Sequence, residues 1–156
     1  MSVPSATVSA SPPIAAATLI VLREGASETE VLMLRRQHAL NAFGGLWVFP
    51  GGKIEAADRT YAAWLAALTD TLPATDLFTS VPGGAPDMGS HASRVAAIRE
   101  TFEETGLLYV SVADPPFGPR YQRHREDWRI AVARDAHAFE ALLEAEKAKP
   151  DLRALH

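Results

Sequence analysis

The sequence contains no cysteine, which excludes a disulfide framework and a zinc site built on thiolates. It also has no basic tract of the length that a nucleic-acid footprint needs, and its formal net charge is −4. The first apolar run, Ile14 to Leu22, has about half the length of a membrane helix, and no lysine or arginine precedes it. We therefore expect a cytoplasmic protein with no signal peptide or membrane span and no DNA or RNA partner.

The bulk composition is that of one globular domain. Of the 156 residues, 47% are hydrophobic and 22% are charged, which is ordinary for a chain with a real core. Residues 1–13 are rich in serine, alanine and proline. We predict that they form a flexible N-terminal arm, followed by a single domain over residues 14–156.

Apolar runs bounded by turn residues predict several short elements. Residues 15–23 and 30–35 predict a hairpin, and residues 46–49 predict a strand that leads into Pro50-Gly51-Gly52. Residues 61–68 predict a short helix, residues 107–112 a strand, and residues 124–147 have helical composition. The sequence thus indicates a mixture of strands and helices.

Three carboxylates lie on one face of a further predicted helix, which ends at Gly106. At 100° per residue, Glu103 and Glu104 lie about 60° to one side of Glu100 and about 40° to the other. Val95, Ile98 and Phe102 fall on the opposite side, which we expect to be buried. Like charges at this spacing repel, and Mg²⁺ or Mn²⁺ would relieve the repulsion because hard cations prefer oxygen ligands. A solvated acidic face is the alternative.

The segment from Gly52 to Leu107 resembles the signature of the Nudix hydrolases, Gly-x5-Glu-x7-Arg-Glu-(aliphatic)-x-Glu-Glu-x-Gly-(aliphatic). It departs from the signature in three places. Asp58 stands where the signature has glutamate, Thr101 occupies an aliphatic position, and forty residues, 59–98, replace the seven-residue spacer. A long insert at this point of the signature is similar to the peroxisomal-type coenzyme A diphosphatase branch of the family. The amino-acid sequences of residues 48–52, 56–58 and 97–104 also resemble that branch.

This resemblance implies an α/β fold of the Nudix type, an α/β/α sandwich with a mixed sheet. Several strands normally follow the acidic helix in that fold, whereas only one is predicted here. We therefore expect the domain to be incomplete at its C-terminal end, with open sheet edges that favour a homodimer. The insert, residues 59–93, must double back to bring Asp58 near the start of the acidic helix. It is either a lid or wall over the substrate or a surface excursion without a role.

The activity that the resemblance implies is divalent-metal-dependent hydrolysis of a pyrophosphate linkage in a nucleoside diphosphate derivative. The favoured substrate is coenzyme A or an acyl-coenzyme A, cleaved to 4′-phosphopantetheine and adenosine 3′,5′-bisphosphate. ADP-ribose, nucleotide sugars and dinucleotides are alternative substrates. A Nudix-like binding or regulatory module without activity is the alternative from another class.

The resemblance also implies the residues of the site. Glu100, Glu103, Glu104 and the carbonyl of Gly51 would hold Mg²⁺ or Mn²⁺. Either Glu100 or Glu103 would take the proton of the attacking water, and Arg99 would orient a carboxylate by charge-assisted hydrogen bonds.

Three further residues are candidates for binding the small-molecule substrate. Arg35 and Arg36 follow a predicted strand, and guanidinium groups match phosphate oxygens in pairs. Two solvated side chains are the alternative there. Gly52 has no side chain and permits close approach of the backbone to a phosphate or an ion, although an ordinary turn has the same composition.

Overall fold

Short strands form the first part of the chain and helices most of the rest. The computed structural model describes residues 13–36, 44–68, 91–112, 119–152 and 155. The strands are β1 (Ala16–Thr18), β2 (Leu22–Glu24), β3 (Thr29–Val31), β4 (Leu34–Arg35), β5 (Trp47–Val48), β6 (Gly51–Lys53), β7 (Val110–Val112) and β8 (Ala148–Pro150). The helices are α1 (Ala56–Leu68), α2 (His91–Thr105), α3 (Pro119–Arg134) and α4 (His137–Ala145). The predicted N-terminal arm up to residue 12, and residues 69–90 of the predicted insert, lie outside the described residues.

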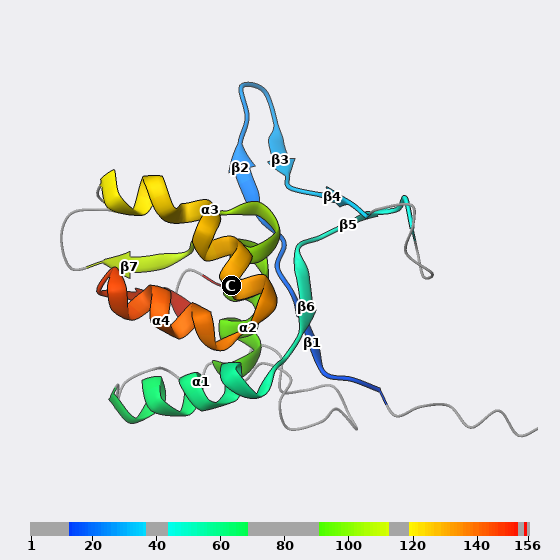
Figure 1. Ribbon diagram of the computed structural model, residues 1–156. Coiled ribbons are helices and arrows are strands. Elements are labelled where there is room, and N and C mark those ends of the chain that lie inside the picture. Colours follow the sequence, from blue (N-terminus) through cyan, green and yellow to red (C-terminus); the bar gives the residue numbers. More distant parts are fainter. Residues whose placement is uncertain (1–12, 37–43, 69–90, 113–118, 153–154, 156) are drawn as a thin grey trace, which may run out of the picture.

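The described strands pair two by two, and every pair is antiparallel: β1 with β6, β2 with β3, β4 with β5 and β7 with β8. The predicted α/β class is confirmed, although the described part of the chain contains antiparallel pairs and not one mixed sheet. In Figure 1 the β2–β3 hairpin projects away from the helices, whereas β1 and β6 run beside α2.

The predicted strand over residues 15–23 is divided because it changes partners. Its first half, β1, pairs with β6, and its second half, β2, pairs with β3. At the change, the Leu19 amide donates to the carbonyl of Pro50 at 2.9 Å, and Val21 accepts from the Leu32 amide at 2.9 Å. The hairpin that the sequence predicted is therefore present, but it is shorter than the apolar run.

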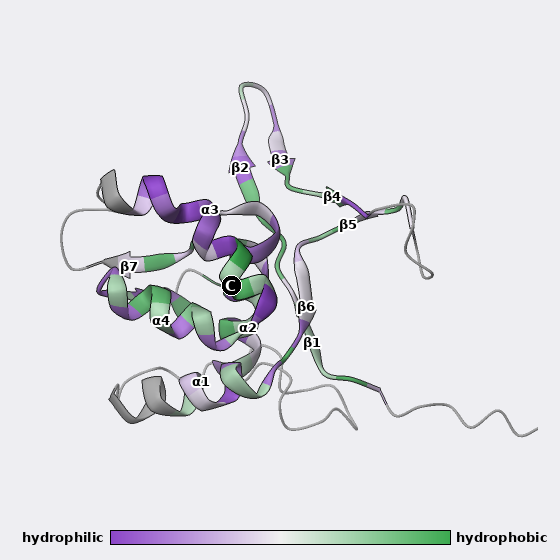
Figure 2. Ribbon diagram, viewed as in Figure 1, coloured by the Kyte–Doolittle hydropathy of each residue, from purple (hydrophilic) through white to green (hydrophobic). Residues whose placement is uncertain are grey.

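Helix α2 lies at the centre of the fold and contacts β1 and β6 as well as α1 and α3. Its predicted inner side is buried, since Ile98 and Phe102 are 0% exposed and Val95 is 1% exposed. The Phe102 ring packs against Phe139 of α4 with centroids 6.4 Å apart. Burial of each such side chain contributes about 1.5–3 kcal/mol. Figure 2 shows α4 largely hydrophobic and α3 largely hydrophilic, so α4 supplies more of this core.

The C-terminal end of α2 is held by its own stop residue and by a side chain of α3. Gly106 has a φ of 76° and donates its amide to the Phe102 carbonyl at 2.8 Å, as the predicted helix end requires. Arg129 donates to the carbonyl of Glu103 at 3.0 and 3.1 Å and to that of Glu104 at 3.1 Å. These bonds satisfy carbonyls that the helix itself leaves without partners.

A second strand follows the acidic helix, which corrects the expectation of a single one. Residues 148–150 form β8 and pair with β7, with Ser111 opposite Lys149. Residues 148–150 have no alternating pattern, and Pro150 lacks an amide hydrogen, so the strand depends on its partner and not on local propensity. The helical stretch predicted over 124–147 is two helices, α3 and α4, separated at residues 135–136. Within the described residues no helix has both the length and the apolar character to cross a membrane.

Candidate active site

Arg99 and Asp58 form a buried ion pair that joins two distant parts of the chain. Arg99 Nε lies 2.8 Å from Asp58 Oδ1, Arg99 Nη2 lies 2.9 Å from Asp58 Oδ2, and both residues are 2% exposed. The same Nη2 donates to the carbonyl of Lys53 at 3.0 Å. The chain doubles back between them, as predicted. It brings Asp58 to the middle of α2 and not to its start, because the helix already begins at His91.

Arg99 also contacts two of the three candidate glutamates. Its Nη2 lies 3.0 Å from Glu100 Oε1, and its Nη1 lies 3.5 Å from Glu103 Oε2. Burial alone would lower the pKa of Arg99, but the hydrogen bonds and charge of Asp58, followed by those of Glu100, raise it above its ordinary value. Arg99 is therefore a permanent cation at the base of the acidic face.

The three glutamates share one electrostatic environment. Burial raises the pKa of each above its ordinary value. The charge of Arg99 opposes this for Glu100 and Glu103, and the Gly51 amide opposes it for Glu104. Each carboxylate also raises the pKa of another: Glu103 that of Glu100, Glu104 that of Glu103, and Glu100 that of Glu104. The cluster thus favours any cation that enters it.

Gly51 and Gly52, which belong to strand β6 and do not form a turn, lie directly against this acidic face. The Gly51 amide donates to Glu104 Oε2 at 3.1 Å, across 53 residues of sequence. A Cβ atom added to Gly52 would lie only 2.5 Å from Glu100 Cδ, so the absence of a side chain there makes room for the Glu100 carboxylate. The structure therefore brings Gly51 and Gly52 together with Glu100 and Glu104, and the family resemblance implied the position of Gly51 beside the acidic helix.

The donor atoms fit a hard divalent cation in type. Carboxylate oxygens and a backbone carbonyl are the ligands that Mg²⁺ and Mn²⁺ prefer. The raised pKa values show that ionising the three carboxyl groups is unfavourable, and a bound cation would offset this cost. Within the described residues, however, no three acidic or histidine side chains converge into a ready-made metal group. Glu104 is turned to the Gly51 amide and Glu103 to Arg99.

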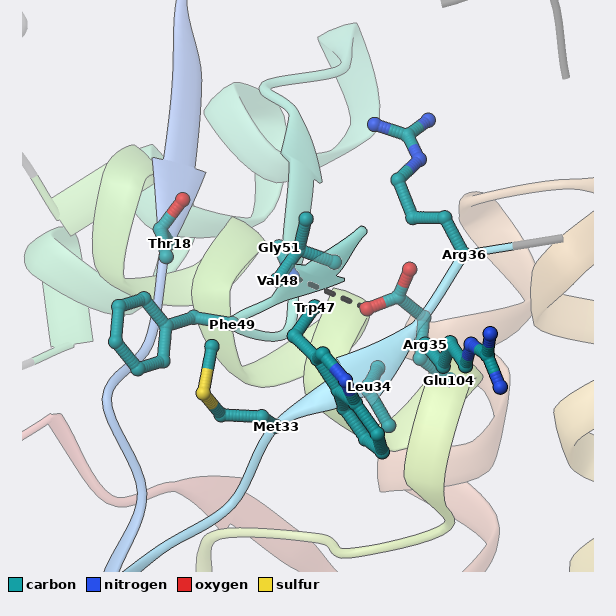
Figure 3. A pocket seen from close by; sticks show the side chains of 10 residues that line it. All are labelled: Thr18, Met33, Leu34, Arg35, Arg36, Trp47, Val48, Phe49, Gly51 and Glu104. Atoms are coloured by element: carbon teal, nitrogen blue, oxygen red, sulfur yellow. Dashed lines mark hydrogen bonds between the residues drawn. The ribbon is translucent and has the colours of Figure 1, made fainter. Parts of the chain in front are cut away.

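A cavity of about 930 Å³ opens beside Glu104 and Gly51 (Figure 3). The predicted phosphate-binding residues Arg35 and Arg36 both line it, and the charge of Arg36 slightly offsets the raised pKa of Glu104. The rest of its lining is largely apolar: Thr18, Met33, Leu34, Trp47, Val48 and Phe49. The arginines and the acidic helix, which are far apart in sequence, thus border the same space.

A second cavity, of about 420 Å³, lies on the other side of the acidic face. Glu100, Glu103 and Arg99 line it together with Asp135 and His137 from the junction of α3 and α4. The acidic face therefore borders two cavities, with Glu104 at the larger one and Glu100 and Glu103 at the smaller one.

Asp58 and Trp47 are among the residues of this region that were not predicted as members of the site. Asp58 was noticed only as a departure from the signature, and its acidic side chain inside a run of helical composition was the available signal. Trp47 was read as part of a strand, and a tryptophan in a short strand gives no sign of whether it faces core or solvent.

The fold, together with the contact between Gly51-Gly52 and the acidic helix, defines a Nudix domain. The chain belongs to the Nudix family. It matches the NUDT19 Nudix domain family over residues 5–156, so the resemblance to the coenzyme A diphosphatase branch is confirmed. Nudix hydrolases generally use divalent metals.

Individual relatives agree with this assignment. The chain is 32% identical to the acyl-coenzyme A diphosphatase NUDT19 of Gallus gallus, over 84% of this chain and 42% of the relative. It is 30% identical to the Homo sapiens protein of the same name, over 81% of this chain and 40% of the relative. A crystal structure of a Nudix hydrolase from Alicyclobacillus acidocaldarius matches with a TM-score of 0.62 and 29% identity, over 89% of this chain and 57% of that one. The chain thus spans about two fifths of the length of these curated relatives.

Proposed function

We propose that this protein hydrolyses the pyrophosphate linkage of a nucleoside diphosphate derivative with Mg²⁺ or Mn²⁺ as cofactor. The substrate we favour is coenzyme A or an acyl-coenzyme A, and the products are then 4′-phosphopantetheine and adenosine 3′,5′-bisphosphate. The names of the chicken and human relatives, acyl-coenzyme A diphosphatase, support this choice.

One observation carries the proposal: Gly51 and Gly52, at the start of β6, lie against the acidic face of α2. The two segments lie on opposite sides of the long insert in the sequence. Arg99 supports their contact, because it binds both Asp58 and the carbonyl of Lys53, the residue after Gly52. An acidic helix that served only for solubility would need no such buried connection.

Glu100, Glu103, Glu104 and the Gly51 carbonyl are the residues that we propose hold the cation. When bound, the cation neutralises phosphate charge and lowers the pKa of water. Arg99 orients Glu100 and Glu103, and Asp58 in turn fixes Arg99. Supporting residues of this kind commonly contribute 10–100-fold to metal affinity or activity.

The proton of the attacking water passes to Glu100 or Glu103. The pKa of each is raised by burial, and a carboxylate with a raised pKa is a stronger base than one in water. Both side chains share the acidic face of α2 with Glu104, which borders the larger cavity where we propose that the phosphates bind.

Arg35 and Arg36 bind the phosphates in the larger cavity, which both residues line. Their guanidinium groups supply positive charge in a cavity whose other lining side chains are largely apolar and include the carboxylate of Glu104, which would repel a diphosphate. Gly52 stays a proposed substrate-binding residue, and its backbone lies directly against the Glu100 carboxylate.

A panel of pyrophosphates tests the proposal. Coenzyme A, acyl-coenzyme A, ADP-ribose, a nucleotide sugar and a dinucleotide are incubated with and without Mg²⁺ or Mn²⁺, and the products are identified by mass. We expect metal-dependent release of 4′-phosphopantetheine from coenzyme A or its acyl esters. Preferred cleavage of another compound would reassign the substrate, and no metal-dependent turnover of any compound would favour a binding module. The cytoplasmic location and the homodimer stay predictions.

A further inference from the structure

Trp47 is the most exposed large aromatic side chain among the described residues that line the larger cavity. Its side chain is 62% exposed, while most of the large apolar residues in the core are almost fully buried. The exposure is not a consequence of disorder in its strand, because β5 pairs with β4 in a defined register, with Trp47 opposite Arg35. The Arg36 amide extends the pairing by donating to the Leu46 carbonyl at 3.0 Å.

The surroundings of Trp47 combine an aromatic surface with positive charge. Trp47, Arg35 and Arg36 border one cavity with Glu104, as Figure 3 shows. A cavity of about 930 Å³ lies within the size range of sites that hold ligands larger than a single phosphate. A ligand that satisfies both features is planar and aromatic at one end and anionic at the other.

We infer that Trp47 is the platform on which the base of the nucleotide substrate stacks, while Arg35 and Arg36 hold its phosphates towards Glu104. The inference rests on the proposed function and adds the part of the substrate that is recognised. Indole and base stack through their π-faces, whatever the identity of the base, and an adjacent guanidinium strengthens such contacts. Trp47 would thus select substrates that carry a base over other diphosphates.

A binding experiment with the wild-type chain tests the stacking directly. Adenosine 3′,5′-bisphosphate is added in the presence of Mg²⁺ while tryptophan fluorescence is followed, with inorganic phosphate as the ligand without a base. The sequence contains three tryptophans, so the signal of Trp47 is the part that is lost in Trp47→Phe. We expect quenching by the nucleotide, no quenching by phosphate, and little quenching in Trp47→Phe although the nucleotide still binds.

A kinetic experiment separates stacking from a merely structural role. Trp47→Leu keeps an apolar side chain in the strand but has no π-face, and Trp47→Phe keeps a smaller ring. We expect KM for a substrate with a base to rise about tenfold in Trp47→Leu, and less in Trp47→Phe, with kcat nearly unchanged. KM for a diphosphate diester of two alkyl alcohols, which has no base, stays at the wild-type value.

Leu46→Ala is the matched control. Leu46 is 54% exposed and precedes Trp47, and its contact with Arg36 uses only the backbone carbonyl. It should leave both KM values unchanged. Equal KM increases for the substrates with and without a base, or nucleotide quenching that survives in Trp47→Phe, would overturn the inference while leaving the proposed function intact. Nucleotide binding without hydrolysis of any pyrophosphate would instead contradict the proposed function alone.

Discussion

Asp58 and Arg99 meet through two nitrogen–oxygen contacts of 2.8 and 2.9 Å, and each residue is 2% exposed. Asp58 belongs to the first turn of α1 and Arg99 to the middle of α2, so the pair also fixes these two helices to each other. The carboxylate additionally accepts from the Glu55 amide at 2.8 Å. Asp58 therefore has a structural role in positioning the acidic helix.

Replacing Asp58 with asparagine should destabilise the protein strongly. The substitution removes the fully buried one of the three carboxylates that pair with Arg99, and breaking a buried pair in this way costs about 3–5 kcal/mol. Urea denaturation measures the loss. Glu30→Gln is the control, because it breaks the exposed Glu30–Arg23 pair and should cost no more than about 1 kcal/mol. Similar losses in both variants would contradict the structural role of Asp58.

Replacing Glu103 with glutamine should reduce kcat for the pyrophosphate substrate by more than about 100-fold, beyond the usual effect of removing a supporting residue. The amide can neither take the proton of a water nor hold a cation with full negative charge. Steady-state kinetics and calorimetric titration with Mn²⁺ measure the two consequences. Glu126→Gln, on the exposed surface of α3, is the control. Activity that is unaffected by Glu103→Gln would remove Glu103 from the site.

Replacing Gly52 with alanine should impair activity by displacing Glu100. The added methyl group would come within 2.5 Å of the Glu100 carboxyl carbon. Gly106→Ala is the matched comparison: the residue there has a φ of 76°, so backbone strain costs about 1–2 kcal/mol, but the nearest atom is 3.2 Å away in the Arg129 side chain. We expect Gly52→Ala to lose kcat and metal affinity, and Gly106→Ala to lose mainly thermal stability. The reverse pattern would contradict the contact between Gly52 and Glu100.

The metal-free protein should become less stable as the pH rises above the ordinary carboxyl range. Burial and mutual repulsion raise the pKa values of Glu100, Glu103 and Glu104 above the ordinary 4.5. The folded chain therefore binds protons more tightly than the unfolded chain. Its stabilisation from these groups is complete below pH 4.5 and is lost as the pH rises through the raised values.

Thermal midpoints across this pH range measure the effect. The combined Glu100→Gln and Glu103→Gln variant should flatten the profile, and Mg²⁺ should raise the midpoint of the wild type more as the pH rises, because the cation competes with protons for the carboxylates. Identical profiles for the variant and the wild type would show that the cluster does not set the pH dependence.

The features that the sequence predicted correctly are those that depend on local periodicity. Helical spacing predicted the buried side at Ile98 and Phe102, and the glycine at position 106 predicted the end of α2. The position of Gly51 beside the acidic face was predicted from the family resemblance, because no local sequence pattern contains it.

The features that the sequence did not predict depend on partners far away in the chain. The strand over residues 15–23 divides because its two halves pair with different strands, and β8 exists because β7 lies beside it. The pairing of Asp58 with Arg99 crosses 41 residues, and the exposure of Trp47 depends on what surrounds it in space. Such properties require tertiary contacts, which periodicity does not encode.

The bonds from Arg129 to the last carbonyls of α2 bear on protein engineering. The signature segment, residues 52–107, does not contain all the groups that hold its own structure. The carbonyls in its final helical turn, which carries Glu103 and Glu104, accept hydrogen bonds from Arg129, more than twenty residues downstream. Grafting the segment into a foreign scaffold without that guanidinium would leave this turn free to fray. A transplanted site would therefore need α3, or a substitute donor in the same place, to keep its carboxylates in register.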